Sequence, residues 1–285
     1  MQVIHQKFLL DIDFPLLVFI TDTQEFPPHW HEAVEIVYAL EDHLKIGVNH
    51  ETHMLKARDI ILIGGGDVHF FPPQSLPIPR LIIQFDLSFY ESFSTLLRDK
   101  RLPAALLRES TESAVPGEPG IHSVMERQLL EIMKESEQKH DGYKLALKAR
   151  MFDLLILLLR RVPMESLSSY EKSRRLGRLA RLDKVLLHVE QHFERTILLE
   201  EVADVANFSV FHFTRFFRET TGLTFGQYVN QYRIAKAIDY LVNSSDTITE
   251  IVYKSGFSNA KTFNRVFRQI KGCSPTVFKK AVSEV

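Results

Sequence analysis

The last hundred residues of the chain contain one helical pattern written twice. The segment FTRFFRETTG at 213–222 matches FNRVFRQIKG at 263–272 with an offset of 50 residues. Upstream the offset falls to 49 residues, so the second copy gains one residue between Ser258 and Phe263. A repeat of this length indicates one supersecondary unit used twice.

Each copy predicts a helix, a tight turn and a second helix. Asn207 takes the left-handed position that ends the first helix, and Gly256 takes it in the second copy. Ser209 and Ser258 are expected to cap the helices that follow, because their hydroxyls accept from free backbone amides. The inward positions are Phe213, Phe216 and Phe217 in the first copy and Phe263, Val266, Phe267 and Ile270 in the second. A helix, a tight turn and a second helix whose exposed face is basic form a helix-turn-helix arrangement.

Basic and acidic residues are distributed unevenly along the chain. Residues 171–285 hold 18 Lys and Arg against 12 Asp and Glu, whereas residues 1–170 hold 17 against 24. Such asymmetry indicates that the C-terminal half meets a polyanion. The alternative is that the basic faces are only solvated, with Arg215 paired to Glu219 one turn on. Two copies with arginines at matched places favour the nucleic-acid interpretation.

Three segments of this half resemble the DNA-binding domain of the AraC-type (arabinose-regulator-like) transcription factors. They are LEEVADVANFSVFHFTRFFRETTG at 199–222, YVNQYRIAKAIDYL at 228–241 and ITEIVYKSGFSNAKTFNRVFRQIKGCSPTVFKK at 248–280. The resemblance covers about 182–281 and implies two helix-turn-helix units joined by a long helix. A helix from about Gly226 to Val242 spans roughly 26 Å. Two recognition helices could then enter adjacent major grooves, which recur about 34 Å apart.

The resemblance also implies which side chains meet DNA. It places base-facing positions at Phe211, Thr214 and Arg215 in the first unit and at Ala260, Lys261, Thr262 and Arg265 in the second. The arginines suit guanine O6 and N7, and Phe211 suits a thymine methyl group. Arg218 and Arg268 extend the two basic faces. The expected partners are double-stranded promoter DNA and, by resemblance, RNA polymerase.

The first ninety residues have the pattern of short strands separated by turn residues, which is typical of a β-sandwich or small barrel. The predicted strands are 16–20, 33–40, 43–48, 51–56, 59–63 and 80–85. Within them, PHWHEAVEIVYAL at 28–40 and RDIILIGGGDVHFF at 58–71 resemble the cupin sensor domain that AraC-type regulators often carry ahead of the DNA-binding domain.

The sequence therefore predicts an α+β chain of two domains. A hydrophobic content of 45% in 285 residues is enough for two cores. The first domain, 1–162, is a cupin-like barrel for effector sensing with a helical dimerisation segment. Residues 163–178 are polar, begin with Pro163 and are interpreted as a linker. Residues 179–285 form the all-α double helix-turn-helix domain.

A cluster of polar residues is predicted inside the barrel. His29, His31 and Glu35 share one strand parity, and His69 follows the glycine turn. In metal-binding cupins this spacing forms a metal site, and imidazole and carboxylate ligands suit a divalent transition metal. A buried polar cluster and an organic effector are the alternatives. We favour the effector, with no resident cofactor. Further candidates for the effector pocket are Trp30, Tyr38, Arg80 and Gln84.

Helices are predicted between the barrel and the linker. A short helix is expected at 92–102, and two long helices at 121–161 break near 140–142. In the second long helix Leu145, Phe152, Leu155, Ile156 and Leu159 form a broad apolar surface. This surface could pack on the barrel, form a homodimer interface, or do both, and the resemblance favours the dimer.

These features predict a DNA-binding transcriptional regulator that responds to a small molecule, with a carbohydrate as the expected effector, and not an enzyme. The rival interpretation is a metal-dependent cupin enzyme fused to a DNA-binding domain. The single cysteine, Cys273, permits no internal disulfide and fits a reducing cytoplasm. The most apolar run, at 154–159, is too short to span a bilayer, so no membrane partner is expected.

Overall fold

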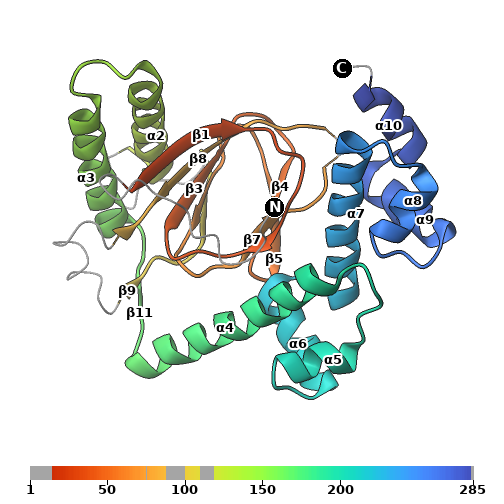
Figure 1. Ribbon diagram of the computed structural model, residues 1–285. Coiled ribbons are helices and arrows are strands. Elements are labelled where there is room, and N and C mark those ends of the chain that lie inside the picture. The colour runs from red at the N-terminus through yellow and green to blue at the C-terminus, as the bar shows by residue number, and fades with distance from the viewer. Residues whose placement is uncertain (1–14, 75, 88–99, 110–118, 284–285) are drawn as a thin grey trace.

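The computed structural model describes residues 15–74, 76–87, 100–109 and 119–283. The strands are β1 (Leu16–Thr21), β2 (Phe26–His29), β3 (Val34–Ala39), β4 (Leu44–Val48), β5 (Glu51–Leu55), β6 (Ile60–Ile63), β7 (His69–Phe71), β8 (Arg80–Phe85), β9 (Lys100–Arg101), β10 (Ala105–Leu107) and β11 (Glu165–Ser166). The helices are α2 (Ile121–Gln138), α3 (Tyr143–Arg161), α4 (Ser169–His192), α5 (Leu199–Val205), α6 (Val210–Thr221), α7 (Phe225–Asn243), α8 (Ile248–Lys254), α9 (Ala260–Lys271) and α10 (Pro275–Ser283). The strands lie at the centre, and helices flank them on both sides (Figure 1).

Two antiparallel sheets form the N-terminal domain and confirm the predicted barrel class. One has the order β1-β8-β3-β6-β10 and the other the order β2-β7-β4-β5. Strand β2 is an edge strand of its sheet and contains Pro27 and Pro28, which a central strand would not accommodate. Strands β2 and β7 are absent from the predicted set because the first is rich in proline and the second is only three residues long.

Side chains of the larger sheet alternate between two cores. On β3, Val37 and Ala39 belong to the core that Leu44 and Ile46 of β4 complete. The side chains between them in the sequence face the other way and join a core with helices α2 and α3. One face of this sheet is thus the barrel wall, and the other is covered by the helical pair.

The two long helices α2 and α3 confirm the predicted helical pair and pack on the outer face of the sheet. Lys139 has a positive φ of 48° and ends α2, and Gly142 precedes α3. Leu155 is 2% exposed and lies in the core shared with the sheet, whereas Ile156 is 39% exposed. Most of the short helix predicted at 92–102 lies outside the described residues, and its end, Lys100–Arg101, forms strand β9.

Helix α4 begins ten residues earlier than expected. Residues 163–178 were predicted to be a linker, but residues from Ser169 onward are helical. Ser168 and Glu171 form a capping box, in which the Ser168 side chain accepts from the Glu171 amide and Glu171 accepts from the Ser168 amide. This cap fixes the start of the helix in a polar stretch whose composition resembles a linker. The barrel domain is therefore joined to the helical domain by one continuous 24-residue helix.

Both helix-turn-helix units are present, with α5 and α6 in the first and α8 and α9 in the second (Figure 1). Asn207 and Gly256 have the predicted left-handed φ values, 55° and 85°. A side chain at Gly256 would place its Cβ 2.0 Å from the Phe193 carbonyl oxygen, so only glycine fits there.

One predicted cap is wrong. Ser209 caps α6, but Asn259 and not Ser258 caps α9, with its Oδ1 accepting from the Thr262 amide at 2.8 Å. Asn259 takes the N-cap place that Ser209 has in the first copy, so the extra residue of the second copy precedes this cap. Within the described part of the chain, no helix is both long enough and apolar enough to cross a membrane.

Candidate functional site

Two recognition helices display matched surfaces on the helical domain. Helix α6 buries Phe213 and Phe217, and helix α9 buries Phe263 and Phe267 at the equivalent places. Burying these rings leaves the opposite faces in solvent. The side chains predicted to meet DNA are exposed on those faces, apart from Thr262, which is half-buried: Phe211, Thr214, Arg215 and Arg218 on α6, and Ala260, Lys261, Arg265 and Arg268 on α9.

The two central arginines differ in their neighbours. Arg215 Nε donates to Glu219 Oε1 at 2.7 Å, so the solvated pair considered from the sequence does exist. Its two side chains are 71% and 51% exposed, and water and salt weaken such a pair enough for a nucleic acid to replace it. Arg265 forms no ion pair with any described residue and is exposed. Arg265 is thus the arginine that is more readily available to a base edge.

Helix α7 separates the two units and confirms the predicted linking helix. It runs from Phe225 to Asn243, begins with a capping box between Thr224 and Gln227, and spans roughly 28 Å at 1.5 Å per residue. Helix α6 ends just before it and α8 begins just after it. The length of α7 is comparable with the interval of about 34 Å between successive major-groove faces.

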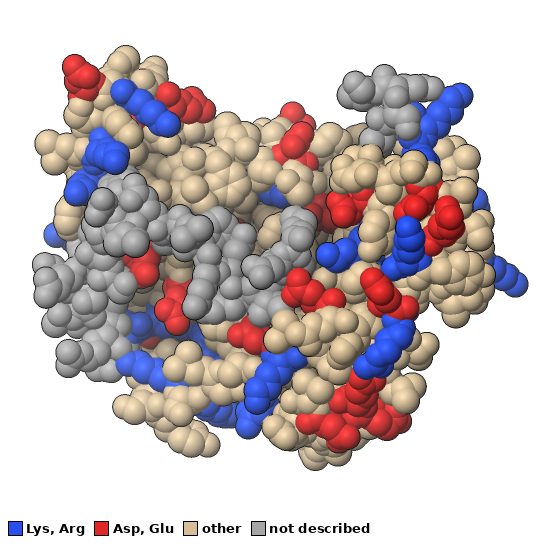
Figure 2. Space-filling view, in the orientation of Figure 1, with Lys and Arg blue, Asp and Glu red and all other residues tan. Residues whose placement is uncertain are grey.

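A basic hollow beside α6 was not predicted. Arg178 of α4 lines it together with Arg215, Arg218 and His50. Arg178 Nε donates to Thr220 Oγ1 at 2.8 Å, which holds the guanidinium at the edge of the recognition helix. Lys and Arg side chains gather over α4 and acidic side chains over α5 in Figure 2. The sequence signal was the run of arginines at 174–181, which the linker interpretation hid.

The predicted histidine cluster does converge inside the barrel. His29 on β2 pairs in register with His69 on β7 in one sheet, and Glu35 on β3 pairs with Gln84 on β8 in the other. His31 lies in the turn between β2 and β3 and brings its ring between the two sheets. Its Nε2 atom lies 3.3 Å from Glu35 Oε2, and His69 Nε2 lies 3.5 Å from the same oxygen.

The convergence does not follow from the parity of one strand. Strand β2 ends at His29 and β3 begins at Val34, so the chain turns between the first histidine and Glu35. The three histidines and Glu35 face one another from two opposed sheets and the turn that connects them. All four side chains are at most 5% exposed.

Backbone carbonyls orient all three imidazole rings. The Nδ1 atoms of His29, His31 and His69 lie 3.0, 2.9 and 2.9 Å from the carbonyl oxygens of Pro27, Ala33 and Asp67. A carbonyl oxygen only accepts, so this pattern assigns the proton to Nδ1 and directs Nε2 inward. One nitrogen from each ring lies within 4.8 Å of the others. With Glu35, these residues fit the donor set and the outer-shell orientation of a divalent transition metal.

Burial and mutual contact set the charges of this cluster. Burial lowers the pKa of His29 well below its usual range, and the neighbouring His69 and His31 lower it further. Burial opposes ionisation of Glu35, but His69 and His31 hold the pKa of its carboxyl group well below the usual range. Burial likewise opposes protonation of His69, yet Glu35 raises the pKa of that imidazole. The site therefore holds a carboxylate beside at least one neutral imidazole.

A cavity of ≈ 100 Å³ adjoins the cluster, and Arg80 and Gln84 line it as expected. Phe26 and Phe71 form an aromatic wall, and the Arg80 guanidinium lies 3.8 Å from the centre of the Phe71 ring. His29 and Glu35 form part of the same lining. The cavity thus combines ring faces with a few buried polar groups, as a site for a small organic molecule does.

Two other predicted pocket residues lie elsewhere. Tyr38 faces the helical pair, where its hydroxyl donates to Glu126 Oε1 at 2.7 Å. Trp30 lies in the core of the helical domain, and its Nε1 donates to Asp183 Oδ1 of α4 at 2.7 Å. The predictions for both were wrong because strand alternation shows which way a side chain points but not which helix covers it.

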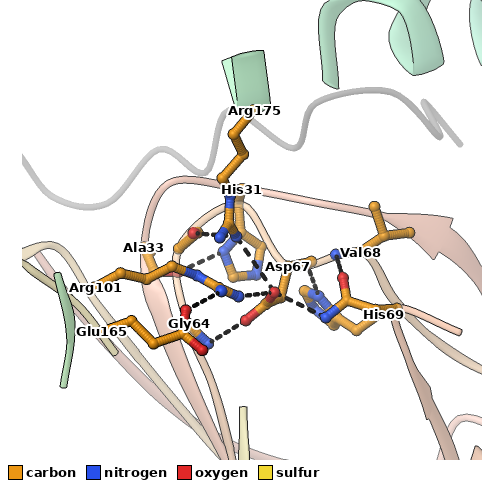
Figure 3. A network of polar contacts seen from close by, with 11 residues as sticks. His31, Ala33, Gly64, Asp67, Val68, His69, Arg101, Glu165 and Arg175 are labelled. Carbon is orange, nitrogen blue, oxygen red and sulfur yellow. Dashed lines mark hydrogen bonds and ion pairs between the residues drawn. The ribbon is translucent and has the colours of Figure 1, made fainter. Parts of the chain in front are cut away.

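A network that sequence reasoning missed connects the cluster to α4 (Figure 3). Asp67 is 1% exposed and accepts from Arg101 and Arg175, while its backbone oxygen accepts from His69 Nδ1. Arg175 Nη2 also donates to the Gly65 carbonyl oxygen at 3.0 Å. A Cβ atom on Gly65 would lie 2.2 Å from the Glu32 carbonyl oxygen, so the glycine turn is required for this close packing.

Comparison with known protein families gives two matches. Residues 16–155 match a family described as "AraC-like ligand binding domain", and residues 202–281 match one described as "Helix-turn-helix domain". The first match contains the barrel and most of the helical pair, and the second contains both recognition helices.

Several curated relatives are called HTH-type transcriptional activator RhaS. The protein from Enterobacter sp. (strain 638) is 32% identical over 150 residues, which is 52% of this chain and 51% of the relative. The protein from Escherichia coli O1:K1 / APEC is 33% identical over 54% of each chain. In these matches the chain spans about half the length of the relative. The protein from Shigella sonnei (strain Ss046) is 28% identical over 88% of this chain and 86% of the relative.

Solved structures also match. The DNA-binding domain of AdpA, described as a global transcriptional factor in complex with a target DNA, is 26% identical and covers 36% of this chain and 94% of its own, with a TM-score of 0.36. ToxT from Vibrio cholerae O395 is 15% identical and covers 95% of this chain and 99% of its own, with a TM-score of 0.45.

Proposed function

The chain belongs to the AraC-type transcriptional regulators, and from this premise we propose that it binds promoter DNA with both helix-turn-helix units under the control of a small effector held in the barrel. The observation that carries the proposal is the matched pair of exposed basic recognition helices, α6 and α9, which belong to the two units that α7 connects. The named relatives come from bacteria, in which promoter DNA lies in the cytoplasm, and we propose the same location for this protein.

The barrel cavity supports the effector part of this proposal. It lies beside Glu35 and His29, and the network through Asp67 leads from the same histidine cluster to helix α4. An effector regulates only if its affinity differs between two arrangements of the DNA-binding units. A ligand that moves the cluster would shift the anchor of α4, because His69 and Arg175 bind the same aspartate.

A regulator accounts for the chain better than the rival cupin enzyme. The curated relatives, including one that matches 88% of this chain, are named as transcriptional activators and not as enzymes. We also propose a homodimer formed through α3, because Leu145 and Ile156 leave apolar surface exposed on the helix whose other side covers the barrel. Contact with RNA polymerase is proposed from the family alone.

Binding to DNA can be measured by fluorescence anisotropy with the intact protein and a site selected from random duplexes. Arg265→Ala is expected to relax the preference at one base pair by about 1–3 kcal/mol. The matched control is Gln269→Ala, which changes an exposed side chain one turn further along the same helix. An Arg265→Ala protein that weakens binding equally at every sequence would show that Arg265 contacts only phosphate.

A further inference from the structure

The buried guanidinium of Arg80 has no anionic partner among the described residues. Arg80 is 1% exposed, and its Nη1 and Nη2 atoms donate to the carbonyl oxygens of Ile78 and Thr23 at 3.2 and 2.9 Å. Its Nε atom has no hydrogen-bond partner in the described part of the chain. A cationic group removed from water is costly unless an anion compensates it, so an unpaired one that lines a cavity requires explanation.

One oxygen of the nearby Glu35 carboxylate already has several polar partners. Glu35 Oε2 accepts from Gln84 Nε2 and lies within 3.5 Å of the Nε2 atoms of His31 and His69. Asp22, the other acidic residue that influences Arg80, is exposed to solvent. Neither carboxylate forms an ion pair with the guanidinium, so Arg80 retains N–H groups for a further partner.

Arg80 offers hydrogen-bond donors to the cavity, whereas the other polar groups of the cavity wall offer acceptors. Gln84 Oε1 is buried and has no hydrogen-bond partner among the residues that the structure describes, and His29 directs Nε2 inward because its Nδ1 donates to the Pro27 carbonyl oxygen. Both atoms accept hydrogen bonds, as does Glu35. A molecule that fits must therefore supply an anionic acceptor at Arg80 and donors, such as hydroxyl groups, towards Glu35 and Gln84. The faces of Phe26 and Phe71 suit the apolar face of a small ring.

We propose that the effector is a small hydroxylated carboxylate, such as a sugar acid, whose carboxylate binds to Arg80 while its hydroxyl groups donate to Glu35 and Gln84. This inference rests on the proposed effector-responsive function and narrows the expected carbohydrate to an anionic one. The Phe71 ring under the guanidinium holds its plane, which suits the paired contacts of an arginine with a carboxylate. A metal on the histidines would add positive charge and would favour the same class of ligand.

The test uses matched pairs of acid and neutral sugar with the intact protein in buffer containing EDTA. D-galacturonate is compared with D-galactose, and D-glucuronate and D-gluconate with D-glucose, by thermal shift and by calorimetric titration. At least one acid is expected to raise the melting temperature and to bind roughly ten- to a hundredfold more tightly than its neutral partner. Equal affinity within each pair, or no binding by any acid, would overturn the proposal.

Variants separate ligand binding from support of the fold. Arg80→Gln should bind acid and neutral sugar equally, and Arg80→Lys should retain part of the preference because it keeps a positive charge. Lys56→Gln removes an exposed charge from the same domain and should leave the preference unchanged. If Arg80→Gln does not fold, the wild-type comparison and Arg80→Lys still decide the outcome. An Arg80→Gln protein that folds and keeps the full preference for the acid would contradict the assignment.

The same experiment distinguishes this inference from the proposed function. A neutral sugar that binds and changes the affinity for DNA would leave the effector-responsive regulator intact and reject the anionic effector. An acid that binds at Arg80 without any change in DNA affinity would support the site and reject its regulatory role. The DNA measurement uses the selected duplex at one fixed salt concentration.

Discussion

Asp67 and Arg175 meet across the junction between the barrel and helix α4, where Arg175 Nη2 lies 3.3 Å from Asp67 Oδ1. The backbone oxygen of the same aspartate accepts from His69 in the barrel cluster. One residue therefore anchors both a histidine of the cluster and the helix that leads to the first helix-turn-helix unit. Physical connection alone does not establish coupling, which requires a perturbation of the contact.

We expect Arg175→Ala to reduce the effect of the effector on DNA binding. The variant removes the contacts to Asp67 and Gly65 but leaves both domains with their cores, so the coupling free energy should fall by roughly 0.5–2 kcal/mol. The measurement is the ratio of DNA affinities with and without effector. Arg174→Ala, an exposed neighbour on the same helix, is the control. An unchanged ratio in Arg175→Ala would place the coupling elsewhere.

Substitutions at two adjacent residues of helix α3 test the fold and the proposed dimer interface separately. Leu155→Glu buries an unpaired charge against the barrel and should cost about 3 kcal/mol or more, with loss of folded protein. Ile156→Glu lies on the exposed side and should give folded monomers if α3 forms the dimer interface. Met54→Glu, at an exposed apolar residue of β5, should change neither property. Sedimentation and circular dichroism separate these outcomes, and a dimeric Ile156→Glu protein would exclude this interface.

Because Glu126 contacts Arg58, the free energy of unfolding should depend on pH in the acid range. The Arg58 guanidinium, with the Tyr38 hydroxyl, lowers the pKa of Glu126 from 4.5 to about 2. A carboxylate with a lowered pKa stabilises the fold above its unfolded pKa, and this contribution is lost as the pH falls from about 4.5 towards 2. Chemical denaturation at pH 6 and pH 3 should show a larger decline for the wild type than for Glu126→Gln. Equal declines would show that this carboxylate does not contribute.

The histidine cluster can be tested for resident metal. We expect protein purified without a polyhistidine tag to contain far less than one transition-metal ion per chain, and His31→Ala to abolish the response to effector. Elemental analysis and the DNA-affinity ratio measure the two properties. One metal per chain, retained after dialysis against a chelator and lost in His31→Ala, would establish a metal centre there instead.

The helix-turn-helix units could be predicted residue by residue because their signals are local. Phe213 and Phe263 repeat at the same place in each helix, and Asn207 and Gly256 occupy positions whose backbone conformation few other residues tolerate. An inserted residue was recognised between Ser258 and Phe263, but the role of Asn259 as a cap was not, since a serine at the preceding position offers the same chemistry.

The barrel site could be predicted only in part because it depends on contacts between distant segments. The convergence of His29, His31, Glu35 and His69 was expected, although with the first three on one strand and His69 on a neighbouring strand, and not from two opposed sheets. Trp30 and Tyr38 were placed in the pocket because no sequence pattern shows that α4 and α2 cover them. Arg175 was assigned to a linker, since the pairing of a polar stretch with Asp67 some hundred residues away leaves no periodic signal.

The spacing of the DNA site gives the decisive measurement. Duplexes selected by the intact protein should contain two short preferred blocks about one helical turn apart on the same DNA face, because α7, roughly 28 Å long, lies between the two helix-turn-helix units. Inserting five base pairs between the blocks should reduce the affinity to that of one block alone, whereas changing bases between the blocks should have little effect. Undiminished affinity after the insertion, or binding without any sequence preference, would contradict a regulator that reads DNA with both units.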